Sequence, residues 1–548
     1  TVMLRWTSSS DKQMVSDAYR LGDLVIKADV TDITAAYLIN NIELAFKVWH
    51  ETSWGKDIPF DVFCEEILPY RVSTEPLENW REKALASFAD IYRSFMKDTA
   101  ITTVEACSKV NSLLPRFRID KDFPPTCFSQ LMASARGSCD EMSDLATFSM
   151  RALGIPVSTD FTPLWPDRLN GHTWSSVYDN TSGKHVTFVS TEQNPGSHRI
   201  LIPVSKVLRR TFSIREKIND EQFNIPPVLQ DVRANDVTEE YGASANLSIP
   251  VVNRPLFGTQ YAYLATPYET SWNIIRRGNA GQDSIRFLSV GKRVLYLPVY
   301  YKNNMQTAAS YPFLLEDNGE CRFFQPGAMQ SITVTRVAPP HEPWVQRMAG
   351  GVFEAANLAD FSDAQTLCVI KKIDGSWFHT TSIKNTKKFR YIRYVSPKRA
   401  NCNVAEIEFY NETGEKLTGS VIGTESLENS TMTRDKAFDG DPATYFDAAN
   451  DQSWTGLYLD APQTITKIRY LPRNDGNGIY EGHVYELLYW DGNIWFSLGK
   501  KTADGHVLKY DAPANSLLIV KNITAGRIFR RTCIIEDGVQ RWLPYDFL

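Results

Sequence analysis

A cysteine at the start of a predicted helix is the first chemically suggestive feature of the sequence. It lies in RGSCDEMSDLATFSMRALGIPV, residues 136–157, where Ser138 and Glu141 have the spacing of a capping box. This pattern predicts that Cys139 occupies the first helical turn. The unpaired backbone amides of that turn carry partial positive charge, which favours thiolate and lowers the pKa of a cysteine. We therefore expect a nucleophilic thiol at Cys139.

A histidine suited to act as the base follows in the sequence GHTW. Gly154 and Pro156 end the predicted helix, and alternation in HTWSSVYD and KHVTFVS then predicts two strands joined by a short turn. His172 stands at the start of the first strand. A strand packed against the helix N-terminus brings His172 within hydrogen-bond reach of Cys139. Because a lone cysteine in a helix is more often core filler, the pair depends on this combination of spacings.

The residues around this pair resemble the transglutaminase-like superfamily from about Cys127 to Pro195. The shared pattern is G-x-C before a helix, a helix ending in LGIPV, and HTW on the first strand of a hairpin. The matching residues are Gly137, Cys139, Leu153, Gly154, Ile155, Pro156, His172 and Trp174. The resemblance implies an α+β fold of the papain-like cysteine hydrolase class, with Cys139 and His172 as a catalytic pair. Segments on either side also resemble multi-domain proteins of gut-type Bacteroidetes.

The third position of the expected triad departs from the pattern of the superfamily. There an aspartate usually ends the second hairpin strand and fixes the histidine tautomer. Folding the hairpin about the turn near Thr181 and Ser182 places residues 189–192 opposite His172, and none of them is an aspartate. Glu192 is the nearest carboxylate, and it orients His172 if the strand register shifts. Otherwise the site is a dyad, or it is inactive.

The chemistry that this pair implies is acyl transfer through a thioester. Cys139 attacks an amide carbonyl, and His172 takes the thiol proton and later protonates the leaving amine. The backbone amide of Cys139 is a natural oxyanion donor. Trp165 and Trp174 are candidates to line the cleft, although aromatic residues beside a strand are more often core. The resemblance implies a protein or peptide amide as substrate, and no cofactor is expected for catalysis.

The segment DKAFDGDPATYFDA, residues 435–448, resembles the calcium loop of the discoidin or coagulation-factor 5/8 type C domain, a galactose-binding-like β-sandwich. Calcium prefers hard oxygen ligands in a tight turn, and Asp439, Asp441 and Thr444 supply them while Gly440 allows the bend. The simpler interpretation is an Asp-Gly turn without an ion. We expect a structural Ca²⁺ here.

A strand that normally ends such a domain precedes the loop in this sequence. It lies in RYIRYVSP and AEIEFY, residues 390–410, and contributes a glutamate to the ion in the family. Either the domain is permuted and Glu406 completes the site, or the strand closes an earlier, shortened module. Sugars bind such domains at loops, by stacking on an aromatic ring and through polar side chains. The candidates for carbohydrate binding are Trp454, Arg473, Asn474, Tyr480 and His483.

Composition limits the partners of the chain. Lysine plus arginine total 59 against 64 for aspartate plus glutamate, and the net charge of -5 gives no electrostatic reason to expect a nucleic-acid partner. No apolar run approaches the roughly 20 residues of a transmembrane helix. The 8 cysteines are scattered singly, without a CxxC pair, so neither a zinc site nor a redox motif is indicated.

The chain of 548 residues is too long for a single domain, since domains average about 150 residues. Helical periodicity fills the start of the chain, and short alternating strands follow from about residue 236. We expect an α+β domain over residues 1–230, a β-sandwich spacer over 231–345, and a galactose-binding-like sandwich over 346–548, permuted or split near 412. No chemical motif stands in the spacer.

These features give three functional hypotheses. The first is a secreted, periplasmic or surface-attached transglutaminase-like cysteine hydrolase or acyltransferase, targeted to glycan or glycoprotein by its last domain. The second is a glycan-binding surface protein whose transglutaminase-like fold is inactive. The third is an amidase that removes glycans from asparagine, as a peptide N-glycanase does. The sequence opens TVMLRW without a signal core, which indicates a processed product or a trimmed chain.

Overall fold

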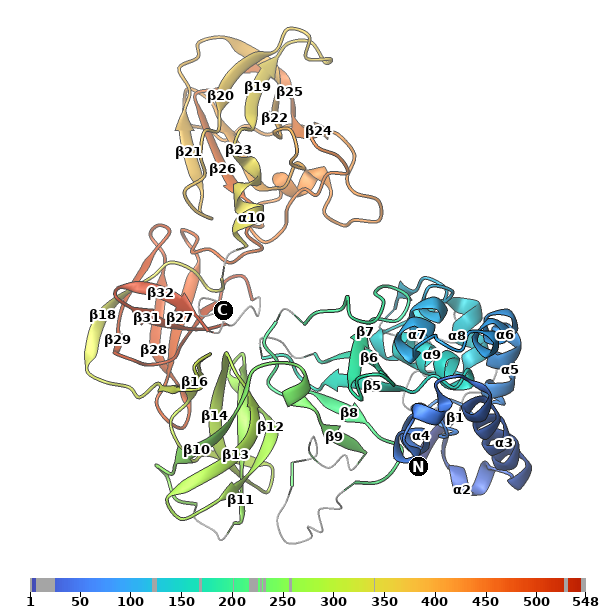
Figure 1. Ribbon diagram of the computed structural model, residues 1–548. Helices are drawn as coiled ribbons and strands as arrows, with labels where there is room; N and C mark the ends of the chain where they lie inside the picture. The colour runs from blue at the N-terminus through green and yellow to red at the C-terminus, as the bar shows by residue number, and fades with distance from the viewer. Residues whose placement is uncertain are drawn as a thin grey trace. The chain divides into compact units, whose positions relative to one another are not determined.

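The computed structural model describes residues 2–5, 25–120, 126–166, 170–200, 202–215, 225–226, 229, 233–255, 259–339, 341–526 and 531–543. The chain divides into two compact units (Figure 1). The first unit is Thr1–Pro267 with Trp272–Phe323, and the second is Tyr268–Ser271 with Phe324–Leu548. Strands far outnumber helices in the order of elements. None of the described helices is both long and apolar enough to cross a membrane.

The helical part of the first unit packs around one buried helix, α9. Apolar residues three and four apart predict helices over 37–49 and 79–98. The second of these is two helices, because the backbone of Phe88 leaves the helical region (φ -114°, ψ 23°). The helices are α2 (Asp29–Asp32), α3 (Ala35–Glu51), α4 (Phe60–Glu66), α5 (Trp80–Ser87), α6 (Ala89–Lys97), α7 (Thr103–Asn111), α8 (Phe128–Ser134) and α9 (Cys139–Ala152).

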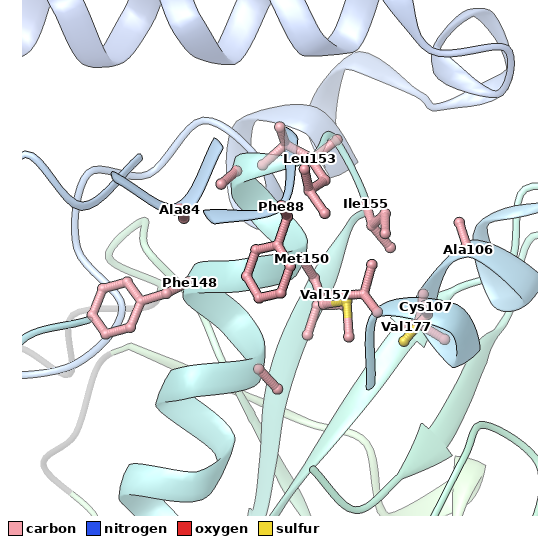
Figure 2. Close-up of a cluster of buried hydrophobic side chains, with 14 of the residues drawn as sticks. Ala84, Phe88, Ala106, Cys107, Phe148, Met150, Leu153, Ile155, Val157 and Val177 are labelled. Carbon is pink, nitrogen blue, oxygen red and sulfur yellow. The ribbon is translucent and has the colours of Figure 1, made fainter. Parts of the chain in front are cut away.

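Helix α9 supplies the centre of the core of the first unit. Every residue from Glu141 to Ala152 is buried. Figure 2 shows Phe148 and Met150 of α9 among side chains from α5, α7 and the strands that follow. The helix ends as the sequence predicts, because Gly154 adopts a positive φ of 74° and its amide bonds to Arg151. Burial of this helix fixes the position of its first residue, Cys139.

A five-stranded sheet lies against α9. Its order is β7-β6-β5-β8-β9, all antiparallel. The strands are β5 (Val157–Thr162), β6 (His172–Tyr178), β7 (His185–Phe188), β8 (Leu208–Arg210) and β9 (Ala234–Asp236). Two short pairs, β1 (Val2–Arg5) with β2 (Val25–Ala28) and β3 (Arg118–Ile119) with β4 (Arg136–Gly137), lie outside it. The hairpin predicted after the helix is confirmed as β6 and β7.

An eight-stranded sheet completes the first unit around a separate apolar core. Its strands are β10 (Ser244–Pro250), β11 (Tyr261–Tyr268), β12 (Ser271–Ala280), β13 (Ser284–Gly291), β14 (Val294–Lys302), β15 (Met305–Ala308), β16 (Phe313–Leu315) and β17 (Cys321–Phe323). The alternating pattern of this stretch therefore does form strands. The unit ends at Phe323, and the domain bounds expected near residues 230 and 345 stay predictions.

The second unit holds two β-sandwich cores. One core lies between the sheets β20-β19-β22-β25-β24 and β21-β26-β23, with the short helix α10 (Glu342–Val345) beside it. Its strands are β19 (Val352–Ala356), β20 (Gln365–Val369), β21 (His379–Ser382), β22 (Lys388–Val395), β23 (Val404–Tyr410), β24 (Ser420–Gly423), β25 (Trp454–Thr464) and β26 (Lys467–Pro472).

The other core joins strands that are far apart in the sequence. β18 (Met329–Val334) pairs with β29 (Leu508–Pro513), and these two pack on the sheet β28-β27-β30-β31-β32. The remaining strands are β27 (Val484–Trp490), β28 (Trp495–Thr502), β30 (Leu518–Asn522), β31 (Thr532–Glu536) and β32 (Val539–Trp542). The β19–β26 sandwich is thus inserted, in sequence, between the first strand of this core and the rest.

Candidate functional site

The cysteine starts α9 as the sequence predicts. The Ser138 hydroxyl accepts a hydrogen bond from the Asp140 amide at 3.1 Å, and the Glu141 carboxylate accepts one from the Ser138 amide at 2.8 Å. Gly137 is required here, because its φ is 154° and a Cβ on it would lie 2.5 Å from the Cβ of Glu141. The capping box and this glycine together hold Cys139 at the exposed end of a buried helix.

Cys139 and His172 line one cavity of about 490 Å³ in the first unit, together with Glu192. The two strands beside α9 bring His172 there, since β6 begins at this residue and pairs with β5 along its length. The Cys139 thiol faces the backbone amide of Thr173, the next residue on β6. No hydrogen bond joins Cys139 to His172, although both line the same cavity.

The protonation states of the two groups differ from the expectation for a thiolate pair. Burial, reinforced by the neighbouring Asp140 carboxylate, raises the pKa of the Cys139 thiol above its ordinary value, although the Thr173 amide opposes the shift. The expected lowering of this pKa by the helix N-terminus is therefore wrong in this conformation. Burial also lowers the pKa of His172, against Asp140 and Glu192. Both groups are neutral at pH 7.

Two tryptophans flank His172. The ring of Trp165 lies 6.2 Å from the imidazole at an angle of 25°, and that of Trp174 lies 5.8 Å away. Both indoles are buried and pack in a small apolar cluster, and neither is among the residues that line the cavity. Both rings pack beside the imidazole and belong to the apolar core. Their position in the core is the alternative that the sequence left open to lining a cleft.

A hydrogen-bonded network holds Trp174 in place. Its indole N–H donates to the Tyr241 hydroxyl at 2.9 Å, and Tyr241 in turn donates to Asp160. Asp160 is fully buried and receives two hydrogen bonds from Arg209, at 2.8 and 2.7 Å. This ion pair connects β5 to β8 in the same sheet, and β5 is the neighbour of β6, the strand that carries His172.

The strand opposite His172 is shorter than the sequence suggests. β7 ends at Phe188, which pairs with Ser175, and the chain then turns back between Val189 and Gln193. Residues 189–192 thus lie in a turn rather than in a paired strand. Glu192 lines the cavity and acts on His172 through its charge, but no hydrogen bond connects them. Its role as the orienting group stays a prediction.

His198 is a cavity residue that sequence reasoning missed. It lines the cavity with Cys139 and His172, and its ring lies 6.0 Å from that of Trp174. Its buried Nδ1 has no hydrogen-bond partner, and both burial and His172 lower its pKa. It lies ten residues beyond the last strand of the hairpin, so no periodicity or spacing pointed to it. Only the turn at 189–193 returns the chain to the cavity.

In the second unit the predicted calcium residues lie in two segments. Asp439 and Thr444 share a turn, in which the Thr444 hydroxyl donates to the Asp439 carboxylate at 2.9 Å. Asp441 closes the same turn by accepting from the Ala443 amide at 3.0 Å. Glu406 comes from β23 and lies beside Asp439. Whether the domain is permuted stays a prediction.

Glu406 is the unusual member of this group. It is 1% exposed, and neither carboxylate oxygen meets the geometry of a hydrogen bond to a described donor. Burial and the nearby Asp439 raise the pKa of Glu406 to about 8. Two orphaned oxygens beside a second carboxylate fit a bound cation. Among the described residues, no three His, Cys, Asp or Glu lie close enough together to hold a metal ion, and the Lys436 ammonium lies 3.2 Å from the Asp439 carboxylate.

The predicted carbohydrate residues do not form one site. Arg473 is stacked between Trp344 and Tyr445, 3.6 and 3.7 Å from their ring centroids, and Asn474 is buried and donates to the Ser376 carbonyl. Trp454 packs on Phe361 and Arg393, at the start of β25. Each of these three side chains is thus engaged within the protein. The sequence showed loops of suitable composition but not these distant partners.

The other two residues line a small cavity. Tyr480 and His483 border a space of about 200 Å³ in the second unit, together with Asp441 and Asp475. Asn522 reaches the same cavity and lies 3.1 Å from Nδ1 of His483. This cavity therefore combines an imidazole, a phenol and two carboxylates beside the Asp439 turn.

One comparison with known proteins identifies part of the chain. The family model of the F5/8 type C domain matches residues 421–530, from β24 to beyond β30. No curated protein matches the chain closely enough to count as a relative. The second unit therefore carries an F5/8 type C, or discoidin, domain, and the match includes Asp439, Asp441 and the two cavity residues Tyr480 and His483.

Proposed function

We propose that the first unit is a cysteine-dependent amide hydrolase or acyltransferase of the transglutaminase-like type. One observation carries the proposal: Cys139, at the capped start of a buried helix, and His172, at the start of the adjacent strand, line a single cavity of about 490 Å³. A cavity of this size accepts a side-chain amide or a short peptide segment.

The neutral resting state suits this chemistry. A neutral imidazole is the form that accepts a proton, so His172 can take the thiol proton when a substrate draws Cys139 toward it. The thiolate then attacks the amide carbonyl, and the Cys139 amide donates to the oxyanion. His172 returns the proton to the leaving amine. Water or an acceptor amine resolves the thioester, which gives hydrolysis or cross-linking.

Alkylation of Cys139 by iodoacetamide across pH, followed by peptide mass spectrometry, tests the pair. We expect His172→Ala to slow labelling of Cys139 at neutral pH, while His50→Ala, at an exposed position on α3, leaves it unchanged. Cys64 and Cys127, which are also partly exposed, are internal standards. Labelling of Cys139 that is unchanged by His172→Ala at every pH would contradict the enzyme proposal and leave the inactive, glycan-binding alternative.

The N-glycanase alternative is separated by its product. If the chain is such an amidase, incubation with an asparagine-linked glycopeptide releases the glycan and converts the asparagine to aspartate. A general amide hydrolase or acyltransferase leaves the glycopeptide linkage intact. The Cys139→Ala variant is the control in both cases, because only the thiol is removed.

We also propose that the second unit binds glycan on an extracellular surface or glycoprotein. The match to the F5/8 type C domain supports this, and the cavity at Tyr480 and His483 offers an aromatic ring and polar groups suited to sugar hydroxyls. Binding of the full chain to immobilised glycans should fall for His483→Ala and persist for His341→Ala, which lies outside the cavity. Equal binding by both variants would exclude this cavity as the sugar site.

A structural Ca²⁺ at Glu406 and Asp439 is part of the same proposal. The burial of Glu406 beside Asp439 supports it, because a bound cation would offset the charge of Glu406, which no described lysine or arginine pairs with. Calorimetric titration of the EDTA-treated chain with Ca²⁺ tests it, with Glu406→Gln as the variant that should lose binding. Heat that is unchanged in Glu406→Gln would place any bound calcium elsewhere.

A further inference from the structure

A second pocket of the first unit, of about 470 Å³, is lined by four arginines. Arg71 follows α4, Arg151 lies near the end of α9, Arg210 ends β8, and Arg233 precedes β9. No acidic side chain is among the described residues that line it. Hydroxyl groups complete the lining, from Ser73, Thr74, Thr159 and Thr211. The topology thus gathers cationic and hydrogen-bond-donating groups from four separate segments.

Two of these arginines are buried and held in fixed positions. Arg71 is 5% exposed, and its guanidinium pairs with Asp29 at 2.8 Å. Arg151 is 6% exposed, and its Nε donates to the Val157 carbonyl at 3.0 Å. Within the described chain no carboxylate oxygen lies within ion-pair distance of Arg151. Burial lowers the pKa of Arg151 to about 10, which leaves it charged at pH 7.

The carboxylates near Arg151, with Glu66 and Glu65 first among them, favour its charged form, but burial outweighs them. Glu66 is bonded to His185, and Glu65 is paired with Arg215. Asp29 is committed to Arg71, and Asp140 pairs with Arg210 at 2.8 Å. Glu75 and Asp144 lie deeper, and burial raises the pKa of both carboxyl groups toward the neutral form. Arg151 donates to the carbonyls of Val157 and Arg71 but forms no ion pair with a described carboxylate, so an anion in the pocket would compensate its buried charge.

We propose that this pocket binds a small organic molecule through an oxyanion group, with Arg151 and Arg233 among its ligands. A guanidinium presents paired N–H donors that match two oxygens of a phosphate, sulfate or carboxylate. The Ser73 and Thr74 hydroxyls add donors in the same space, whereas the Thr211 hydroxyl already donates to the Ser213 carbonyl. Because the volume exceeds that of an isolated oxyanion, the pocket also accommodates the small molecule that carries it. This site is separate from the Cys139 cavity, and it does not depend on the proposed amide chemistry.

Arg233 is the position at which the test is cleanest. Arg210 also holds Asp140, whose carboxylate accepts from the Thr173 hydroxyl at 2.9 Å beside His172. Replacing Arg210 would therefore disturb the Cys139 cavity as well. Arg151 is buried in the core, and its loss risks the fold. Arg233 is only partly buried.

Thermal unfolding of the full chain tests the proposal, with inorganic phosphate, sulfate or malonate as probes and sodium chloride at equal ionic strength as reference. We expect at least one probe to raise the Tm by about 2–4 °C relative to chloride, because a ligand that binds only the folded state stabilises it. The shift should be at least halved in Arg233→Gln and retained in Arg93→Gln, an exposed arginine of α6.

Each outcome decides the proposal. A shift with phosphate or sulfate alone identifies a tetrahedral ligand group, and a shift with malonate alone identifies a carboxylate. Calorimetric titration of the same probe should give a Kd that weakens at least tenfold in Arg233→Gln. Probes that act no differently from chloride, or a shift of equal size in Arg233→Gln and the parent, would overturn the assignment.

Discussion

The Cys139 cavity and the Asp439 turn both keep ionisable groups away from water, but they do so in opposite ways. In the cavity, the thiol and the imidazole are neutral, and neither needs a counter-charge. In the turn, Glu406 is buried beside Asp439, and the Gly440 amide is the donor nearest to its carboxylate. The first arrangement is stable when empty, whereas the second requires a proton or a cation.

The hydrogen-bond networks around the two sites differ as well. Beneath His172, the chain Trp174–Tyr241–Asp160–Arg209 satisfies its polar groups internally and connects three strands and a loop. Around Glu406, the contacts are those of the turn itself, mainly the Thr444 hydroxyl and the Lys436 ammonium on Asp439. We infer that the cavity is preorganised by the fold, whereas the Asp439 turn has fewer contacts with the rest of the protein.

Removal of Asp160 should give the largest effect on stability. Asp160→Ala leaves the buried guanidinium of Arg209 without its main partner, and breaking a buried ion pair costs about 3–5 kcal/mol. Asp90→Ala, which removes the exposed pair with Arg93, should cost less than about 1 kcal/mol. Urea unfolding followed by tryptophan fluorescence measures both. Equal, small losses would show that the network does not support the His172 strand.

The pH dependence of stability should reveal the unsatisfied turn. The pKa of Glu406 rises on folding from an ordinary 4.5 to about 8, so the folded state binds the extra proton. In EDTA, this contribution is complete below pH 4.5 and is lost as the pH rises to about 8. Calcium should restore the Tm at pH 8, and Glu406→Gln should remove both effects. The exposed control Glu412→Gln should keep both the pH dependence and the calcium effect. If the Tm of the parent in EDTA does not change with pH, the raised pKa of Glu406 is contradicted.

The helix and the hairpin that carry Cys139 and His172 could be predicted from short stretches of sequence. The capping residues Ser138 and Glu141 and the stop at Gly154 are defined within one or two helical turns, and each is confirmed. The hairpin follows from alternation alone. Its end was not predictable, because the turn at 189–193 places Thr191 at a φ of 63°, a conformation that no neighbouring residue signals.

Features that depend on distant residues were not predictable. The pKa of Cys139 rises chiefly because the fold buries the thiol, and this burial depends on residues far away in the sequence. Arg473 is stacked on Trp344, far before it in the sequence, and β18 pairs with β29 across the whole inserted sandwich. Periodicity carries no information about such pairings. The F5/8 type C motif was recognised because its turn is a continuous stretch of sequence.

Loss of the α9 cap should have a moderate effect on stability. Ser138→Ala removes the acceptor of the Asp140 amide and should cost about 1 kcal/mol. Thr102→Ala removes the equivalent cap of α7, away from the cavity, at a similar cost. Only Ser138→Ala should also change the rate of Cys139 alkylation. An equal change in both variants would indicate general loosening instead of a shift of the cysteine.

We expect the smallest effect from a change at Glu192, which tests whether this residue acts on His172 through its charge alone or also orients the imidazole. Its carboxylate raises the pKa of His172 without a hydrogen bond, so Glu192→Gln should lower this pKa further, as followed by NMR titration of the imidazole protons. Glu43→Gln, an exposed change on α3, is the control. If Glu192 acts only through charge, the alkylation profile of Cys139 moves along the pH axis and keeps its plateau. A lower plateau at every pH means that Glu192 also orients the imidazole, as the third member of a triad does.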